Sequence, residues 1–349
     1  MSINSPEFGN KNRVHIFLTR RCNNNCPHCY INLPLNAKSK ELPAESWFKI
    51  IDQLVENGFG YLTLTGGEIT VYPDLEKVYV YAKKKGLKVE LMTNATNFSD
   101  DIKNMLLKYP PYQISVTIYG VDAETYTIVT GNKNGWKNFS DNIIFLDGLQ
   151  KEKGTILSLS SVYTKETIKF DDKIKELGYK YTGKKTDFII FLYGRMDKNN
   201  SRNKLIDSVR LSSEQLKEVV LLENKEKKDK GIFKQENTKS DKLIACHSLL
   251  AQESPYFLED GTMSYCIIMP EGDYVLKPTQ DELDNYNYKI MKEKLGKKLE
   301  PLLELKTNKI CANCIIRDSC ITCPIRNLLN GEGLSGFNKD ICFAEIAKK

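Results

Sequence analysis

Three cysteines that could bind metal lie close together in the run Cys22-Asn-Asn-Asn-Cys26-Pro-His-Cys29. They follow a β-rich run, so their thiolates are expected to converge on one loop at the end of a strand. A structural zinc site closes four ligands around the metal, whereas a cubic iron-sulfur cluster held by three thiolates keeps one iron open. The spacing predicts a metal centre with an open position, and a partial zinc site is the alternative. His28 is expected to pack beside it.

Short polar residues recur along the next three strand candidates. The second leads into Gly66 and Gly67, which let the backbone approach a ligand closely, and then into Glu68, whose carboxylate suits an ammonium group. The third ends before Asn94, and the fourth contains Ser115. Because ligands gather at the carboxyl ends of parallel strands, these residues are candidates for cofactor binding.

These motifs resemble those of the radical S-adenosylmethionine (SAM) superfamily, over roughly residues 12–200. The resemblance implies that Cys22, Cys26 and Cys29 hold a [4Fe-4S] cluster whose open iron binds the amino and carboxylate groups of SAM. It further implies that the Gly-Gly-Glu segment holds the amino group, and that Asn94 and Ser115 contact the ribose and methionine moieties. The chemistry it implies is cleavage of SAM to a 5′-deoxyadenosyl radical, which abstracts a hydrogen atom from the substrate.

Seven further cysteines lie in the carboxyl-terminal part of the chain, too many for one site and enough for two. Cys-x2-Cys is also a familiar zinc spacing, so a structural zinc ribbon over residues 311–323 is the alternative. The seven are Cys246, Cys266, Cys311, Cys314, Cys320, Cys323 and Cys342.

This second pattern looks like the SPASM extension of peptide-modifying radical SAM enzymes, which carries two auxiliary [4Fe-4S] clusters. The resemblance implies that the first auxiliary cluster is bound by Cys246, Cys266 and Cys323. It implies that the second is bound by Cys311, Cys314, Cys320 and Cys342. Two residues separate Cys320 from Cys323 where three are usual, and one cysteine of some relatives has no counterpart. The first auxiliary cluster is therefore expected to have an open iron, or to take His247 or a substrate group as its fourth ligand, although His247 also fits an ordinary loop residue.

The elements that must position these residues alternate along the chain. Strand candidates lie at 14–19, 61–65, 87–92, 112–118, 155–162 and 186–192. Helix candidates lie between them, at 44–57, 74–85, 99–108, 136–150 and 167–177. Alternating strands and helices imply a parallel sheet. The fold class expected is α/β, a partial (β/α)6 TIM-like barrel followed by a small cysteine-rich SPASM domain with two auxiliary clusters.

Composition fits an intracellular enzyme. A chain of 349 residues allows one large domain and a smaller one. We expect a radical SAM barrel at 1–210, a bridging helix and charged linker at 211–242, and the SPASM domain at 243–349. No signal peptide opens the chain, and no apolar run approaches the roughly 20 residues that span a bilayer, so a cytoplasmic protein is expected. Ten cysteines in that reducing compartment favour cluster or metal binding over disulfides.

The net charge of +6 is mild, and no basic stripe interleaved with aromatic residues argues for nucleic acid. The charged stretch at 223–242 is interpreted as a solvated linker, with a docking surface for an acidic partner as the alternative.

SPASM relatives mostly act on peptides or proteins, so the expected substrate is a ribosomally made peptide that receives a crosslink or another C–H modification. Sulfatase maturation is an alternative. Its enzymes carry an aspartate directly after the cysteine equivalent to Cys266, where this chain has Ile267. A non-catalytic iron-sulfur or zinc protein is the alternative from another class. About twenty residues precede Cys22, so leader recognition is expected to need a separate protein or the barrel and linker surfaces. Flavodoxin or ferredoxin is the expected electron donor.

Overall fold

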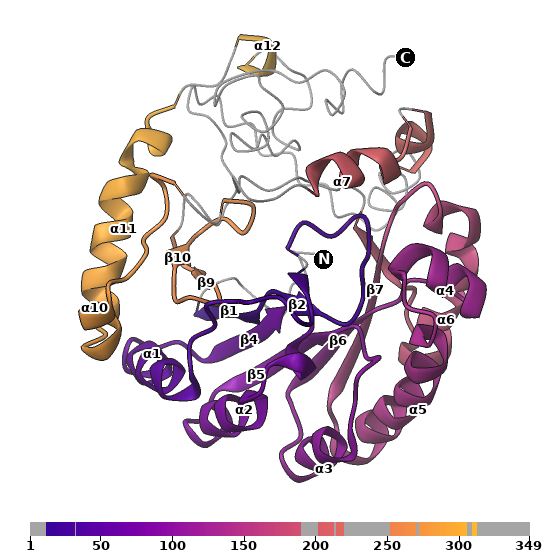
Figure 1. Ribbon diagram of the computed structural model, residues 1–349, viewed down its shortest axis with the longest axis horizontal. Coiled ribbons are helices and arrows are strands. Elements are labelled where there is room, and N and C mark those ends of the chain that lie inside the picture. Colours follow the sequence, from indigo (N-terminus) through magenta and orange to yellow (C-terminus); the bar gives the residue numbers. More distant parts are fainter. Residues whose placement is uncertain are drawn as a thin grey trace.

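The computed structural model describes residues 12–31, 33–189, 202–212, 214–219, 252–269, 272–305 and 309–312. Within them, eight strands form one sheet in the order β10-β9-β1-β4-β5-β6-β7-β8 (Figure 1). The parallel strands that follow chain order are β1 (Arg13–Thr19), β4 (Tyr61–Gly66), β5 (Lys88–Thr93), β6 (Gln113–Thr117), β7 (Ile156–Val162) and β8 (Asp187–Ile189). This succession confirms the predicted α/β fold with a parallel sheet.

Helices cover the outer face of the sheet (Figure 1). The predicted helices correspond to α1 (Ala44–Glu56), α2 (Leu75–Lys84), α3 (Asp100–Lys108), α5 (Gly135–Lys153) and α6 (Asp171–Thr182). The last of these predictions was displaced. Residues 167–170 form a 3-10 turn, and α6 continues past Gly178, where an added Cβ would lie 2.3 Å from the backbone nitrogen of Thr186. A glycine there lets the helix pack directly against that backbone.

One helix that the sequence did not predict, α4 (Ala123–Thr130), follows β6. Its β-branched residues have weak helix propensity, so the periodic pattern is faint. The helix is defined by its ends instead. Asp122 and Thr125 form a reciprocal capping box, and Gly131 ends the helix in a left-handed conformation with φ +68°.

The two faces of the sheet differ in polarity. The inner face carries a network around Glu90, whose carboxylate accepts hydrogen bonds from Arg13, Thr63 (2.9 Å), Gln113 (3.1 Å) and Ser115 (2.6 Å). A buried carboxylate is costly unless it is paired and hydrogen-bonded, so these partners stabilise its charge. The residues that face the helices are buried and aliphatic, and include Val14, Ile16, Leu18, Leu62, Leu64, Val89, Leu91, Ile114 and Val116.

The carboxyl-terminal part extends the same sheet and core. β9 (Tyr256–Phe257) pairs in parallel with β1, and β10 (Met263–Ser264) returns antiparallel to β9. Phe257, Met263 and Leu295 belong to the same hydrophobic core as the buried residues of β1, β4, β5, β6 and β7. The other helices of this and the preceding segment are α7 (Asn203–Val209), α10 (Gln280–Asp284), α11 (Tyr288–Leu303) and α12 (Lys309–Ala312). None of the described helices has the length and apolar character needed to cross a membrane.

Candidate functional site

The three cysteines of the first motif lie on one loop beyond the carboxyl end of β1, as predicted. Residues 22–29 are called the cysteine loop below. Cys22 ends the short strand β2 (Arg21–Cys22), which pairs with β3 (Leu33–Pro34). The N–H of Cys29 donates a 3.1 Å hydrogen bond to the carbonyl of Cys26. Cys26 is buried, Cys22 and Cys29 are half-buried, and none is in a disulfide.

Burial disfavours the ionised form of these thiols. It raises the pKa of Cys22 to about 12, and the charge of Glu68 adds to the shift. Burial also raises the pKa of Cys26, and the neighbouring Cys29 and Cys22 raise it further. Three thiolates therefore need a shared cationic partner here. Three sulfur donors on one loop fit an iron-sulfur cluster by their chemistry. Among the described side chains of His, Cys, Asp and Glu, no three are grouped as a ready-made site for a single metal ion.

The asparagines between Cys22 and Cys26 anchor the loop to other parts of the fold. Asn24 accepts a 2.8 Å hydrogen bond from the side chain of Asn132, which follows α4. The backbone N–H of Asn25 donates a 2.7 Å hydrogen bond to the carbonyl of Thr130, at the end of α4. Helix α4, which the sequence did not predict, therefore supports the cysteine loop.

Arg202, directly before α7, fixes the other end of the loop. Its guanidinium donates hydrogen bonds to the carbonyls of Cys29 (2.8 Å) and Cys26, and to the side-chain oxygen of Asn25 (3.1 Å). Sequence reasoning missed this residue, and no local signal marks it.

Gly66 and Gly67 serve backbone packing. A Cβ on Gly66 would lie 2.3 Å from the carbonyl oxygen of Thr19, and one on Gly67 would lie 2.3 Å from that of Arg21. The N–H of Gly67 donates a 2.8 Å hydrogen bond to Thr19, and that of Glu68 a 3.0 Å hydrogen bond to Arg21. The two glycines thus bring the end of β4 against the backbone that leads into Cys22. The predicted close approach of these glycines to a ligand stays a prediction, and the approach that the structure shows is to this backbone.

The carboxylate of Glu68 is fully buried. Its Oε1 accepts hydrogen bonds from the backbone N–H and the hydroxyl of Thr70 (3.1 and 2.8 Å) and from the hydroxyl of Thr93 (2.7 Å). Its Oε2 accepts a hydrogen bond from the backbone N–H of Asn94 (2.7 Å). Burial raises its pKa, and these hydrogen bonds oppose the shift. Since Oε2 accepts only one of these bonds, it has capacity for another donor.

The side chain of Asn94 points to the cysteine loop. Its Nδ2 lies 2.8 Å from Asn23 Oδ1 and 3.8 Å from Cys22 Sγ, and its Oδ1 accepts from the N–H and hydroxyl of Thr96 (2.9 and 2.6 Å). These contacts use the full capacity of a carboxamide. The structure therefore brings Asn94, Glu68 and Cys22 together. Asn23 and Thr96 are partners that the sequence motifs did not reveal.

Ser115 lies elsewhere on the inner face. Its hydroxyl donates to Glu90 (2.6 Å) and accepts from Gln113 (2.9 Å), and it precedes the end of β6 at Thr117 by two residues. The structure thus places Ser115 in the Glu90 network, without a described contact to the cysteine loop.

Cys266 follows β10 and is half-buried. The next residue, Ile267, packs in a small apolar cluster with Cys29 and Tyr30, whose buried members are Phe17, Ile31 and Leu258. The segment around Cys266 is therefore linked to the cysteine loop by packing. His247, the charged stretch at 223–242 and the side chain of Cys311 lie outside the described residues. The same is true of five further cysteines of the second pattern: Cys246, Cys314, Cys320, Cys323 and Cys342.

His28 of the cysteine loop is buried and packs against Tyr119, and its predicted position beside a metal centre stays a prediction. Its ring lies 5.6 Å from that of Tyr119. Burial lowers the pKa of His28 to about 4, so the imidazole is neutral. Its buried Nδ1 has no hydrogen-bond partner among the described residues. An orphaned polar atom beside three thiols is consistent with a further group at this site.

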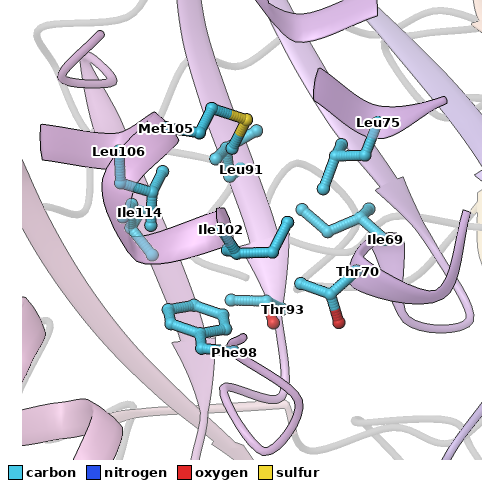
Figure 2. A pocket seen from close by; sticks show the side chains of 10 residues that line it. All are labelled: Ile69, Thr70, Leu75, Leu91, Thr93, Phe98, Ile102, Met105, Leu106 and Ile114. Atoms are coloured by element: carbon cyan, nitrogen blue, oxygen red, sulfur yellow. The ribbon is translucent and has the colours of Figure 1, made fainter. Parts of the chain in front are cut away.

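A small apolar cavity lies on the helix-facing side of β5, where Leu91 and Thr93 line it (Figure 2). Thr70 and Thr93, which hold the Glu68 carboxylate, form part of its wall. The remaining lining residues are apolar: Ile69, Leu75, Leu91, Phe98, Ile102, Met105, Leu106 and Ile114. The cavity is thus a packing space beside the site, because its two hydroxyl groups, those of Thr70 and Thr93, are already bonded to Glu68.

Two curated relatives resemble part of this chain. The antilisterial bacteriocin subtilosin biosynthesis protein AlbA of Bacillus subtilis (strain 168) is 29% identical over 181 residues, which are 50% of this chain and 39% of AlbA. The PqqA peptide cyclase of Bradyrhizobium diazoefficiens is 28% identical over 127 residues, which are 36% of this chain and 33% of the cyclase. The matches thus span less than half of each relative.

Solved structures share the fold more widely. The crystal structure of Streptococcus suis SuiB bound to S-adenosylmethionine has a TM-score of 0.63 at 16% identity, covering 94% of this chain and 76% of that one. Native anSMEcpe with bound AdoMet has a TM-score of 0.56 at 17% identity, covering 88% of this chain and 87% of that one. The model of the Radical SAM superfamily matches residues 16–199, more than half of the 349 residues. The chain therefore belongs to the radical SAM superfamily.

Proposed function

We propose that this radical SAM protein modifies a ribosomally made peptide by abstracting a hydrogen atom from one of its C–H bonds. The observation that carries the proposal is the junction of the cysteine loop with the Gly-Gly-Glu segment. There, the backbone of Gly67 and Glu68 is hydrogen-bonded to residues 19 and 21, directly before Cys22. This junction places a three-thiol donor set beside the segment expected to hold SAM.

The residues have distinct roles in this proposal. Cys22, Cys26 and Cys29 hold a [4Fe-4S] cluster, and the segment Gly66–Glu68 receives the amino group of SAM. When bound and reduced by its electron donor, the cluster would supply the one electron needed to cleave SAM to methionine and the 5′-deoxyadenosyl radical. The protein orients the target C–H bond and excludes water, because efficient transfer needs the reacting atoms at roughly 3 to 3.5 Å. Ser115 remains a weaker candidate for SAM contact, since its hydroxyl is engaged by Glu90 and Gln113.

The relatives support a peptide substrate. AlbA is named for subtilosin biosynthesis, the cyclase for the PqqA peptide, and one SuiB structure is bound to the precursor peptide SuiA. A separate leader-binding protein and an electron donor such as flavodoxin or ferredoxin are part of the proposal, as is a cytoplasmic location.

The carboxyl-terminal part is proposed to be a SPASM domain, with the barrel at 1–210, the linker at 211–242 and the SPASM domain at 243–349. Cys246, Cys266 and Cys323 then serve one auxiliary cluster. The second auxiliary cluster is assigned Cys311, Cys314, Cys320 and Cys342. In support, the fold likeness to SuiB extends over 94% of the chain, and the Cys266 segment packs beside the cysteine loop.

Anaerobic reconstitution tests the proposal. We expect about twelve irons and twelve sulfides per chain, since each cubic cluster holds four, and 5′-deoxyadenosine after reduction with SAM. A content of about four irons with zinc per chain would contradict the two auxiliary clusters but not the cluster at Cys22. Absence of 5′-deoxyadenosine from fully loaded, reduced protein would contradict catalysis and favour a non-catalytic cluster protein. A mass loss in a Cys-type sulfatase peptide would instead support sulfatase maturation, which the apolar surroundings of Ile267 disfavour.

A further inference from the structure

We infer that Asn94 is a positioning residue of the cluster, which directs an N–H hydrogen bond to the sulfur of Cys22, and that Asn23 and Thr96 lock its carboxamide in this orientation. The inference rests on the proposed function, because it requires a cluster at Cys22. It differs from the role implied by the family resemblance, in which Asn94 contacts SAM.

A closed ring of hydrogen bonds fixes the orientation. The backbone N–H of Thr96 can only donate, so the Asn94 atom 2.9 Å from it is the oxygen. The nitrogen of Asn94 therefore faces Asn23 Oδ1 at 2.8 Å, and the nitrogen of Asn23 faces the Thr96 hydroxyl at 2.8 Å. That hydroxyl then donates to Asn94 Oδ1 at 2.6 Å, which closes the ring. Each member is both donor and acceptor, so no amide can flip without breaking two bonds.

The second N–H of Asn94 faces Cys22. With one N–H of Nδ2 given to Asn23, the other lies toward Cys22 Sγ, 3.8 Å from Nδ2. The backbone N–H of Asn24 also donates to this sulfur, at 3.4 Å. Asn94 is 5% exposed and Thr96 2% exposed, so water competes little for these groups.

Hydrogen bonds to ligand sulfurs tune the potential of a cluster. An N–H donor stabilises the extra negative charge of the reduced form, so its removal makes reduction harder. The same residue donates its backbone N–H to Glu68 Oε2 at 2.7 Å. Asn94 therefore connects one cluster ligand directly to the segment proposed to hold SAM.

An EPR-monitored redox titration of the reconstituted full chain tests the inference. The EPR signal that changes when SAM is added identifies the cluster at Cys22, and its midpoint potential is then measured without SAM. We expect N94L to shift this potential to a more negative value at unchanged iron content. T96V, which opens the ring, is expected to give a smaller shift in the same direction. N142L is the matched control, because the buried Asn142 donates to the carbonyl of Ala95 (2.9 Å) without reaching Cys22, and it should keep the wild-type potential.

An N94L potential equal to that of the wild type would overturn the inference. If N94L fails to load a cluster, the midpoint potential of T96V tests the inference instead. A T96V potential equal to that of the wild type would then overturn the inference. Failure of the proposed function is a separate result, seen as wild-type protein that binds no cluster or cannot cleave SAM.

Discussion

Arg202 donates a 2.8 Å hydrogen bond from its Nε to the carbonyl oxygen of Cys29. The two residues are separated by 173 positions in the sequence. The contact connects the cysteine loop to the residue directly before α7. The loop is therefore held by the start of α7 as well as by the end of α4.

Replacing Arg202 should loosen the loop. In R202M the loop loses hydrogen bonds from a charged donor, each worth about 1.5–3 kcal/mol. The population in which the cysteine loop has opened should therefore rise roughly tenfold or more. The measurement is the alkylation rate of the buried Cys26 in metal-free protein. The control is R210M, at the other end of α7, where Arg210 pairs with Asp207 at the surface. Equal Cys26 rates in R202M and wild type would contradict the clamp.

Gly67 should tolerate no side chain. In G67A the new Cβ would lie 2.3 Å from the carbonyl oxygen of Arg21, so the backbone must shift, at a cost of about 1–3 kcal/mol. Urea unfolding of metal-free protein measures the loss. G60A is the control, since a Cβ there meets nothing within 4 Å. The prediction is wrong if both variants unfold at the same urea concentration.

His15 should make stability depend on pH. Burial, with Arg13 as a second cause, lowers the pKa of His15 from 6.5 to about 3. The folded state thus favours the neutral ring, and this contribution is complete above pH 6.5 and is lost as the pH falls toward 3. Compared with H15F, which can keep the stacking on Tyr256 at 4.7 Å, the wild type should lose up to about 1.4 kcal/mol per pH unit in that window. Urea unfolding free energies measured from pH 7 to pH 4 provide the check, and parallel curves for the two proteins would refute it.

Variants of the first three cysteines and of the carboxyl-terminal cysteines should differ in iron content and in SAM cleavage. C26A is expected to lose about four irons and all SAM cleavage, because the cluster that reduces SAM is gone. C266A is expected to lose iron from an auxiliary cluster but to retain 5′-deoxyadenosine formation. Iron analysis and chromatography of the nucleoside distinguish them. A C266A protein that cannot cleave SAM, despite an intact cluster at Cys22, would contradict the separate roles.

The strands and the grouping of three cysteines on one loop could be predicted because their information is local. Five strands, β1, β4, β5, β6 and β7, begin and end within one residue of their predicted bounds, since a buried parallel strand reads as a short β-rich run. The two-residue strands β2 and β3 were not predicted. The spacing of Cys22, Cys26 and Cys29 alone brings three sulfurs to one loop. The failures also have local causes: α4 has weak propensity and is defined by its caps, and the displaced α6 starts after a 3-10 turn and continues through a glycine.

The surroundings of the motif were decided by the tertiary structure. Asn94 is 72 residues from Cys22 and Arg202 is 176 from Cys26, and only the juxtaposition of the strand ends, α4 and α7 brings them together. The same holds for the parallel pairing of β9 with β1, since Ile267 and Cys29 pack against the same small apolar cluster. Sequence periodicity specifies which face of an element is buried, but not which distant element covers it. The sequence thus determined which three thiols share one loop, and the fold decided which neighbours orient that loop.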